Sequence, residues 1–140
     1  MSDAVVPAAW LADRLDSVRV VDVRDAWEYE GIGHLPGAVN VPFDRFRSEE
    51  AGEAGMLPGA ETFADLCSAA GIARDDDVVA YDDMHGVFAA RFLVTAELYG
   101  HDPAKLHLLD GDYSAWSMEH PTSQEVPEPE PTSYEAAYDP

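Results

Sequence analysis

The sequence predicts an α/β fold built on a mostly parallel β-sheet. Three observations lead to this prediction. Helical and strand-like segments alternate along the chain, the strand-like segments are short β-branched runs, and 140 residues suffice for one hydrophobic core but not for two. We expect one domain over residues 1–121, followed by an acidic, proline-rich tail or linker over residues 122–140.

The N-terminal elements begin with a helix. Residues 7–15, "PAAWLADRL", predict a helix that starts at proline and carries its apolar side chains on one face. Residues 18–23, "VRVVDV", are typical of a buried strand, and residues 37–42, "GAVNVP", predict a second strand that proline ends. Residues 43–59 are polar and predict an irregular connection with one helical turn.

The later elements continue the alternation. Residues 60–72 predict an amphipathic helix with a C-cap glycine, and residues 88–100 predict another helix that closes on glycine. Strands are expected at residues 76–81 and 105–110, and a short final helix at residues 112–119. Each of these strands is followed by a helix, as a parallel sheet requires.

The charge balance is strongly acidic, with 28 Asp and Glu against 8 Lys and Arg and a formal net charge of -20. We therefore exclude nucleic acid and anionic membranes as partners, because both need a basic face. The hydrophobic fraction of 46% argues against disorder. Carboxylates over a normal core predict a halophilic source with a salt-rich cytoplasm, and an ordinary acidic protein is the alternative.

Cysteine usage and the N-terminal residues predict a cytoplasmic protein. Cys67 is the single cysteine, which excludes an internal disulfide and agrees with a reducing compartment. Residues 1–10 lack the basic and apolar regions of a secretory signal, and no apolar run reaches the length of a membrane span. We expect no cofactor.

The candidate site is the loop that follows the strand at residues 76–81. In open α/β sheets, ligands bind beyond the carboxyl ends of the strands. The loop leads into the N-terminus of a helix, where converging N–H groups and the helix dipole can hold an anion. Its residues are Asp82, Asp83, Met84, His85, Gly86 and Val87.

Several motifs resemble the rhodanese family. Residues 20–42, "VVDVRDAWEYEGIGHLPGAVNVP", are similar to the signature of Asp-x-Arg, Glu-Tyr, Gly-His-x-Pro-Gly-Ala and Asn-x-Pro. Residues 78–91, "VVAYDDMHGVFAAR", and residues 99–116, "YGHDPAKLHLLDGDYSAW", resemble later parts of that domain, so the resemblance covers roughly residues 5–121. It implies a rhodanese-like fold, with helices on both faces of a small parallel sheet. Asp112 replaces a usual glycine.

The departure with chemical consequences lies at Asp82. By resemblance, active rhodaneses carry a cysteine at this position, where the loop stabilises a thiolate or persulfide. A carboxylate cannot accept sulfane sulfur, and Asp82 together with Asp83 opposes binding of thiosulfate. The segment "YDDMHGVFAAR" specifically resembles the non-catalytic N-terminal half of tandem-domain thiosulfate/3-mercaptopyruvate sulfurtransferases, whose second domain carries the cysteine.

Two other chemistries are conceivable for these residues. Cys67 could replace the loop thiol, but it shares an apolar helix face with Phe63, so we expect it to be buried with a raised pKa. Asp82, Asp83 and His85 could ligate a metal, but adjacent loop residues without a distant ligand form a weak signature. We expect the carboxylates to cap the next helix, and no metal.

The "GHLPGA" turn carries residues with predicted structural roles. His34 could be a base, but turn formers surround it, and we expect it to order the chain before the next strand. Asp22, Arg24 and Glu28 predict a local charge and hydrogen-bond network that holds the turn. Arg91 could face an anion or pair with surface carboxylates, and the sequence leaves both open.

These observations favour a non-catalytic rhodanese-like domain. Such a domain would be a structural or regulatory partner of a cysteine-bearing rhodanese domain or another sulfur-transfer protein. One alternative is an active thiosulfate/3-mercaptopyruvate sulfurtransferase, which would need Cys67 to be exposed. Another is a phosphatase or arsenate reductase on the same fold, which also uses a loop cysteine.

Overall fold

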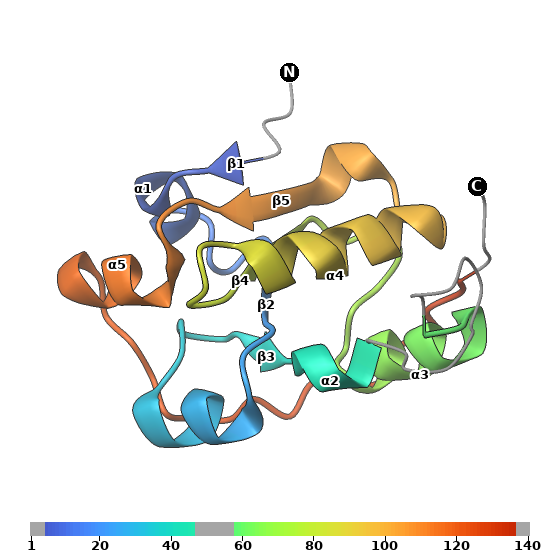
Figure 1. The fold of residues 1–140 in the computed structure, drawn as a ribbon, viewed down its shortest axis with the longest axis horizontal. Helices are drawn as coiled ribbons and strands as arrows, with labels where there is room; N and C mark the ends of the chain where they lie inside the picture. The colour runs from blue at the N-terminus through green and yellow to red at the C-terminus, as the bar shows by residue number, and fades with distance from the viewer. Residues whose placement is uncertain (1–4, 47–57, 137–140) are drawn as a thin grey trace.

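The computed structural model describes residues 5–46 and 58–136, and its strands form one parallel sheet in the order β1-β5-β4-β2-β3 (Figure 1). The strands are β1 (Val5–Val6), β2 (Arg19–Asp22), β3 (Val39–Asn40), β4 (Val78–Tyr81) and β5 (Leu106–Leu109). Every pairing is parallel, so the carboxyl ends of the strands meet at one edge of the sheet. This arrangement confirms the predicted fold class.

Helices cover both faces of the sheet. They are α1 (Ala8–Ala12), the π-helix η1 (Glu28–Ile32), α2 (Phe43–Phe46), α3 (Ala60–Ala69), α4 (Val87–Leu98), the 3-10 helix η2 (Pro103–Lys105) and α5 (Asp112–Glu119). Figure 1 shows α4 lying across the sheet, with α5 near the strand ends from which the loop before α4 departs. In the described ranges, no helix is long and apolar enough to cross a membrane.

The side chains of β4 divide between two hydrophobic cores because successive residues of a strand face opposite sides. Val78 and Ala80 pack with residues of α2, α3 and α4, whereas Val79 and Tyr81 pack with residues of α1, η1 and α5. All four are buried. The sheet is therefore covered on both faces, which fits its continuous apolar strands rather than alternating ones.

Some element boundaries differ from prediction. The helix predicted over residues 7–15 is wrong at its end, because α1 stops at Ala12 and a turn bonded from Arg14 N–H to Leu11 O follows. Strand β1 and helix η1 were not predicted. The connection predicted at residues 43–59 forms α2 at its start, and residues 47–57 lie outside the described part of the chain.

Residues 121–136, here called the C-terminal strap, run from α5 past η1 to α3 (Figure 1). Ser123 forms an antiparallel bridge with His34, and the N–H of Thr132 donates to Ser68 O at 3.0 Å. Tyr134 is only 4% exposed and packs in the α2–α4 core against the ring of Phe63. The strap is thus packed against the domain although its described residues contain neither a helix nor a named strand.

Candidate functional site

Asp82 fills the cradle of N–H groups at the start of α4. Its Oδ1 accepts hydrogen bonds from the N–H groups of Met84 and Gly86, both at 2.8 Å, and its Oδ2 accepts from those of Phe88 and Ala89, both at 2.9 Å. The side chain is almost fully buried. Two of the donors belong to the first turn of α4, where the helix dipole favours negative charge. The anion in this cradle is a carboxylate of the chain itself.

Left-handed backbone at two consecutive residues lets the loop curl around Asp82. His85 has φ +59° and Gly86 has φ +83°. Glycine suits this conformation, and a Cβ at Gly86 would also come within 3.2 Å of the side chain of Leu108. Val87 then begins α4 with an exposed side chain. The loop sequence therefore sets the positions of the four N–H donors.

Two further loop contacts join this site to α5. The carboxylate of Asp83 accepts hydrogen bonds from the hydroxyl of Ser114 at 2.8 Å and from its N–H at 3.1 Å. The carboxylate of Asp112 accepts from the N–H of His85 at 2.7 Å, while the His85 ring points into solvent. Burial raises the pKa of Asp112, and the charges of Asp82 and Asp83 add to this rise. The carboxylates thus bind backbone and hydroxyl donors.

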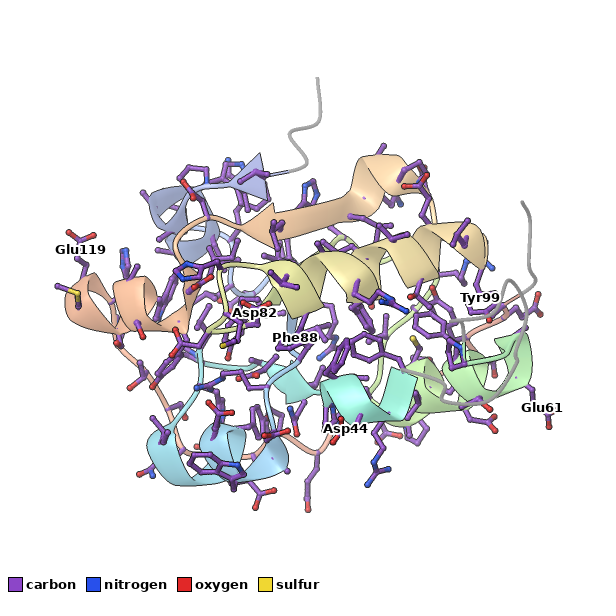
Figure 2. The ribbon with its side chains drawn as sticks, viewed as in Figure 1. Asp44, Glu61, Asp82, Phe88, Tyr99 and Glu119 are labelled. Carbon is purple, nitrogen blue, oxygen red and sulfur yellow. The ribbon has the colours of Figure 1, made fainter. Side chains whose placement is uncertain are left out.

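A cavity of about 590 Å³ opens beside the loop. Its acidic lining residues are Asp25, Glu28, Asp44, Asp82 and Asp83, and its apolar ones are Val23, Phe43, Met84 and Phe88. Figure 2 shows Asp82 and Phe88 next to each other near the start of α4, with Asp44 on α2. Among the described lining residues, Arg24 is the one cation. The cavity therefore has a strongly negative wall beside an apolar one. Within residues 5–46 and 58–136, no group of three or more His, Cys, Asp or Glu is arranged to hold a metal ion.

Arg24 forms a buried salt bridge with Asp22. Its Nη2 lies 2.7 Å from Asp22 Oδ2 and also donates to Gly33 O, and its guanidinium carbon lies 4.0 Å from the centre of the Tyr113 ring. Burial alone would lower the pKa of Arg24, but the hydrogen bond and charge of Asp22 raise it. Asp22 also accepts from the hydroxyl of Tyr81 at 2.6 Å. The single cation of the described cavity lining is thus largely neutralised by a buried partner.

The remaining sequence candidates lie away from the cavity or only at its wall. Glu28 lines it, and its charge contributes to the raised pKa of Arg24. Cys67 is 1% exposed in the core of α3, and burial raises the pKa of its thiol. Arg91 lies half-buried on α4, one turn beyond Phe88, and is not a lining residue. His34 is fully buried in the turn before β3.

Five cavity residues were not among the candidates named from the sequence, namely Val23, Asp25, Phe43, Asp44 and Phe88. The rings of Phe43 and Phe88 lie 4.2 Å apart between their centres and form part of the apolar wall. Asp25 follows β2 and Phe43 follows β3, so both lie beyond the carboxyl ends of strands. The rule that singled out the loop after β4 would have identified them if it had been applied to every strand.

Comparisons with known proteins agree with this fold. Residues 7–119 match the rhodanese-like domain family. The chain is 39% identical over 129 residues to a thiosulfate sulfurtransferase of Corynebacterium glutamicum and 32% identical over 126 residues to thiosulfate/3-mercaptopyruvate sulfurtransferase 2 of Arabidopsis thaliana. The crystal structure of SseA from Escherichia coli, a 3-mercaptopyruvate sulfotransferase, superposes with a TM-score of 0.84 at 26% identity.

The relatives are longer proteins. The alignments cover 90% of this chain but 42% of the Corynebacterium protein, and 82% of this chain but 36% of the Arabidopsis protein. The superposition on SseA covers 98% of this chain and 56% of that structure. The chain therefore spans about half or less of the length of these relatives. The activities of the whole relatives are thus not assigned to this chain by the comparisons.

Proposed function

The chain belongs to the rhodanese-like domain family, and from this premise we propose that it is a non-catalytic domain of the sulfurtransferase class. In this role it is a structural or regulatory partner of a cysteine-bearing rhodanese domain or another sulfur-transfer protein. The observation that carries the proposal is the Asp82 carboxylate, whose two oxygens accept four backbone N–H groups at 2.8–2.9 Å. Those donors would otherwise stabilise a thiolate or persulfide.

The charge of the cavity supports the same proposal. Thiosulfate and mercaptopyruvate are anions. In this cavity they would lie close to carboxylates such as Glu28, Asp44 and Asp83, which oppose their binding. Its one described cation, Arg24, is already bound to Asp22. A positively charged group on a partner domain suits this cavity better than a small anionic sulfur donor, because opposite charges favour association and like charges oppose it.

The competing function is an active sulfurtransferase, which the names of the relatives favour. It requires a sulfur-carrying thiol, and the one cysteine of the sequence is buried in α3. Phosphatase or arsenate-reductase chemistry requires a loop thiol as well, and no contact in the described residues favours it over sulfur transfer. Asp82 therefore weighs against both.

A binding and turnover experiment tests the partner role. The chain is mixed with a cysteine-bearing rhodanese domain, and complex formation is followed by calorimetry while sulfur transfer by the partner is assayed. We expect binding, with a change in the partner's turnover. The paired variant Glu28→Gln/Asp44→Asn should weaken binding, whereas Glu119→Gln at the exposed end of α5 should not. Absence of both binding and any change in turnover would refute the partner role.

A further inference from the structure

The carboxylates around the cavity fall into two groups. Asp82 and Asp83 are bound from within the chain, Asp82 by four backbone N–H groups and Asp83 by the N–H and hydroxyl of Ser114. In contrast, no donor of the described residues binds the side chain of Asp25 or Glu28, which also line the cavity. Asp25 is exposed and Glu28 is half-buried. Within the described part of the chain, these two carboxylates therefore keep their oxygens for a ligand.

The apolar wall of the same cavity includes two aromatic rings. The ring centres of Phe43 and Phe88 lie 4.2 Å apart, and Val23 and Met84 extend the wall. An ammonium group is compact and strongly hydrated. A guanidinium is planar and more weakly hydrated, and it stacks on aromatic faces while its paired N–H groups bind carboxylates. A cavity with both carboxylates and aromatic rings therefore suits a guanidinium better than an ammonium.

The chain already uses this combination beside the cavity. The Arg24 guanidinium donates hydrogen bonds to both oxygens of Asp22, and its central carbon lies 4.0 Å from the centre of the Tyr113 ring. Arg24 also lines the cavity, but it donates to Asp22 and to Gly33 O rather than to the acidic lining. A volume of about 590 Å³ has room for one arginine side chain from outside.

Exposed apolar side chains beside the cavity indicate that this guanidinium comes from a protein. Met84 lines the cavity and Val87 follows it in the same loop, and both side chains are more than half exposed. Arginine is enriched at the centres of protein interfaces, where surrounding contacts exclude water from its charge. An acidic cavity next to exposed apolar side chains thus matches a protein surface with an arginine at its centre.

We propose, on the basis of the proposed function, that the cavity receives an arginine side chain of the partner domain. The guanidinium binds the carboxylates of Asp25 and Glu28. The aliphatic part of the side chain lies against the rings of Phe43 and Phe88, and Met84 contacts the partner's surface around the arginine. Opposite charges on the two surfaces also set the register of the complex.

Titration of the intact chain with butylguanidinium chloride, followed by NMR of the backbone amides, tests the site without a partner. Butylammonium chloride is the matched probe, because it carries the same charge on the same alkyl group. We expect saturable shifts at residues 24–28 and 83–88, and about fivefold weaker binding of butylammonium. Equal binding of the two probes, or shifts spread over the acidic surface without saturation, would overturn the proposal.

Two variants test the individual contacts. Glu28→Gln should weaken butylguanidinium binding, and Phe88→Leu should remove most of the preference over butylammonium. The control Glu119→Gln removes the same charge from the exposed end of α5, outside the cavity, and should change neither. Unchanged binding in Glu28→Gln and an unchanged preference in Phe88→Leu would contradict the proposed contacts. The comparison of the two probes on the wild-type chain needs no variant, so it stands even if Phe88→Leu folds poorly.

Competition with a cysteine-bearing rhodanese domain tests the source of the guanidinium. Binding of that domain is measured by calorimetry in the presence of either probe, at equal concentration and ionic strength. We expect butylguanidinium to weaken the complex more than butylammonium does. Equal weakening by the two probes would reflect screening alone, and it would overturn the arginine contact while the partner role stands. Binding of butylguanidinium without any binding of the domain would instead refute the partner role, and with it a partner's arginine in this cavity.

Discussion

Asp82 determines the chemistry of the site through four backbone hydrogen bonds. The sequence predicted that acidic loop residues cap the next helix, because an aspartate before a helix commonly accepts its first N–H groups. It could not predict four partners for one side chain. That number depends on the left-handed backbone at His85 and Gly86, and only the glycine signals such a conformation in sequence.

Asp82→Asn should destabilise the chain. An asparagine places an NH₂ group among N–H donors, so at least one pair of carboxylate bonds is lost and the remaining ones become neutral. We expect the free energy of unfolding to fall by about 1–3 kcal/mol, measured by urea denaturation at neutral pH. Asp83→Asn, whose carboxylate binds Ser114 at the surface, should cost less. Equal effects of the two substitutions would show that the cradle does not stabilise the fold.

At the scale of elements, the strap and α3 depend on each other. The sequence predicted a C-cap glycine at the end of α3, and the structure confirms it: Gly71 N–H bonds to Ser68 O and Ile72 N–H to Cys67 O. The sequence did not predict that Tyr134 enters the core. Two tyrosines, Tyr134 and Tyr138, among the prolines and acidic residues of the segment over residues 122–140 give no periodic pattern that would indicate burial.

Gly71→Ala should disturb both elements. The residue has φ +77°, and an added Cβ would lie 2.5 Å from Cβ of Pro129 in the strap. We expect a loss of about 1–3 kcal/mol from the backbone conformation alone, with faster hydrogen exchange at Thr132 and Tyr134. Gly31→Ala is the matched control, because a Cβ added there would meet nothing within 4 Å. Unchanged exchange in Gly71→Ala would mean that the strap is not held at this contact.

His101 makes the Tyr134 end of the strap sensitive to acid. Its Nδ1 lies 2.9 Å from the Tyr134 hydroxyl and its Nε2 lies 3.0 Å from Asp76 O. Burial lowers its pKa, the nearby charge of Arg74 lowers it further, and the bond to Asp76 opposes the change. The unfolded chain therefore binds the proton more readily, and stability falls as pH falls below about 6.5.

The expected size of this effect is at most about 1.4 kcal/mol per pH unit. Urea unfolding of the wild-type chain and of His101→Gln is followed from neutral to acidic pH. Because the carboxylates titrate in both proteins, the difference between the two curves gives the contribution of His101. The wild-type chain should lose more free energy of unfolding over this range. Parallel curves for the two proteins would rule out a contribution from His101.

At the scale of the whole molecule, the fold class followed from the alternation of helices and strands, because that alternation leaves few ways to cover a parallel sheet. The two-residue strand β1 and the π-helix η1 escaped prediction, since neither is long enough to show a period. The acidic lining of the cavity was predicted only in part, because Asp25 and Asp44 were not among the candidates. Asp25 and Asp44 are far from Asp82 in sequence and meet it only through the order of the strands.

The net charge of -20 predicts a protein that is more stable in concentrated salt. We expect Tm to rise from dilute buffer to molar KCl, by roughly 4 °C for each kcal/mol of repulsion that screening removes. Differential scanning calorimetry measures this, with sucrose as a control that stabilises folded proteins without screening charge. A Tm unchanged or lowered in KCl would contradict the halophilic interpretation.

Sulfur uptake by the isolated chain tests the central claim most directly, namely that Asp82 replaces the sulfur carrier of the loop. The wild-type chain and the variants Cys67→Ser and Asp82→Cys are treated with thiosulfate in molar KCl. Their intact masses are then measured together with thiosulfate:cyanide sulfurtransferase activity. We predict neither added mass nor activity for the wild-type chain and Cys67→Ser, and a reactive loop thiol only in Asp82→Cys. A gain of one sulfur atom by the wild-type chain, lost in Cys67→Ser, would show that Cys67 carries persulfide and would contradict the claim.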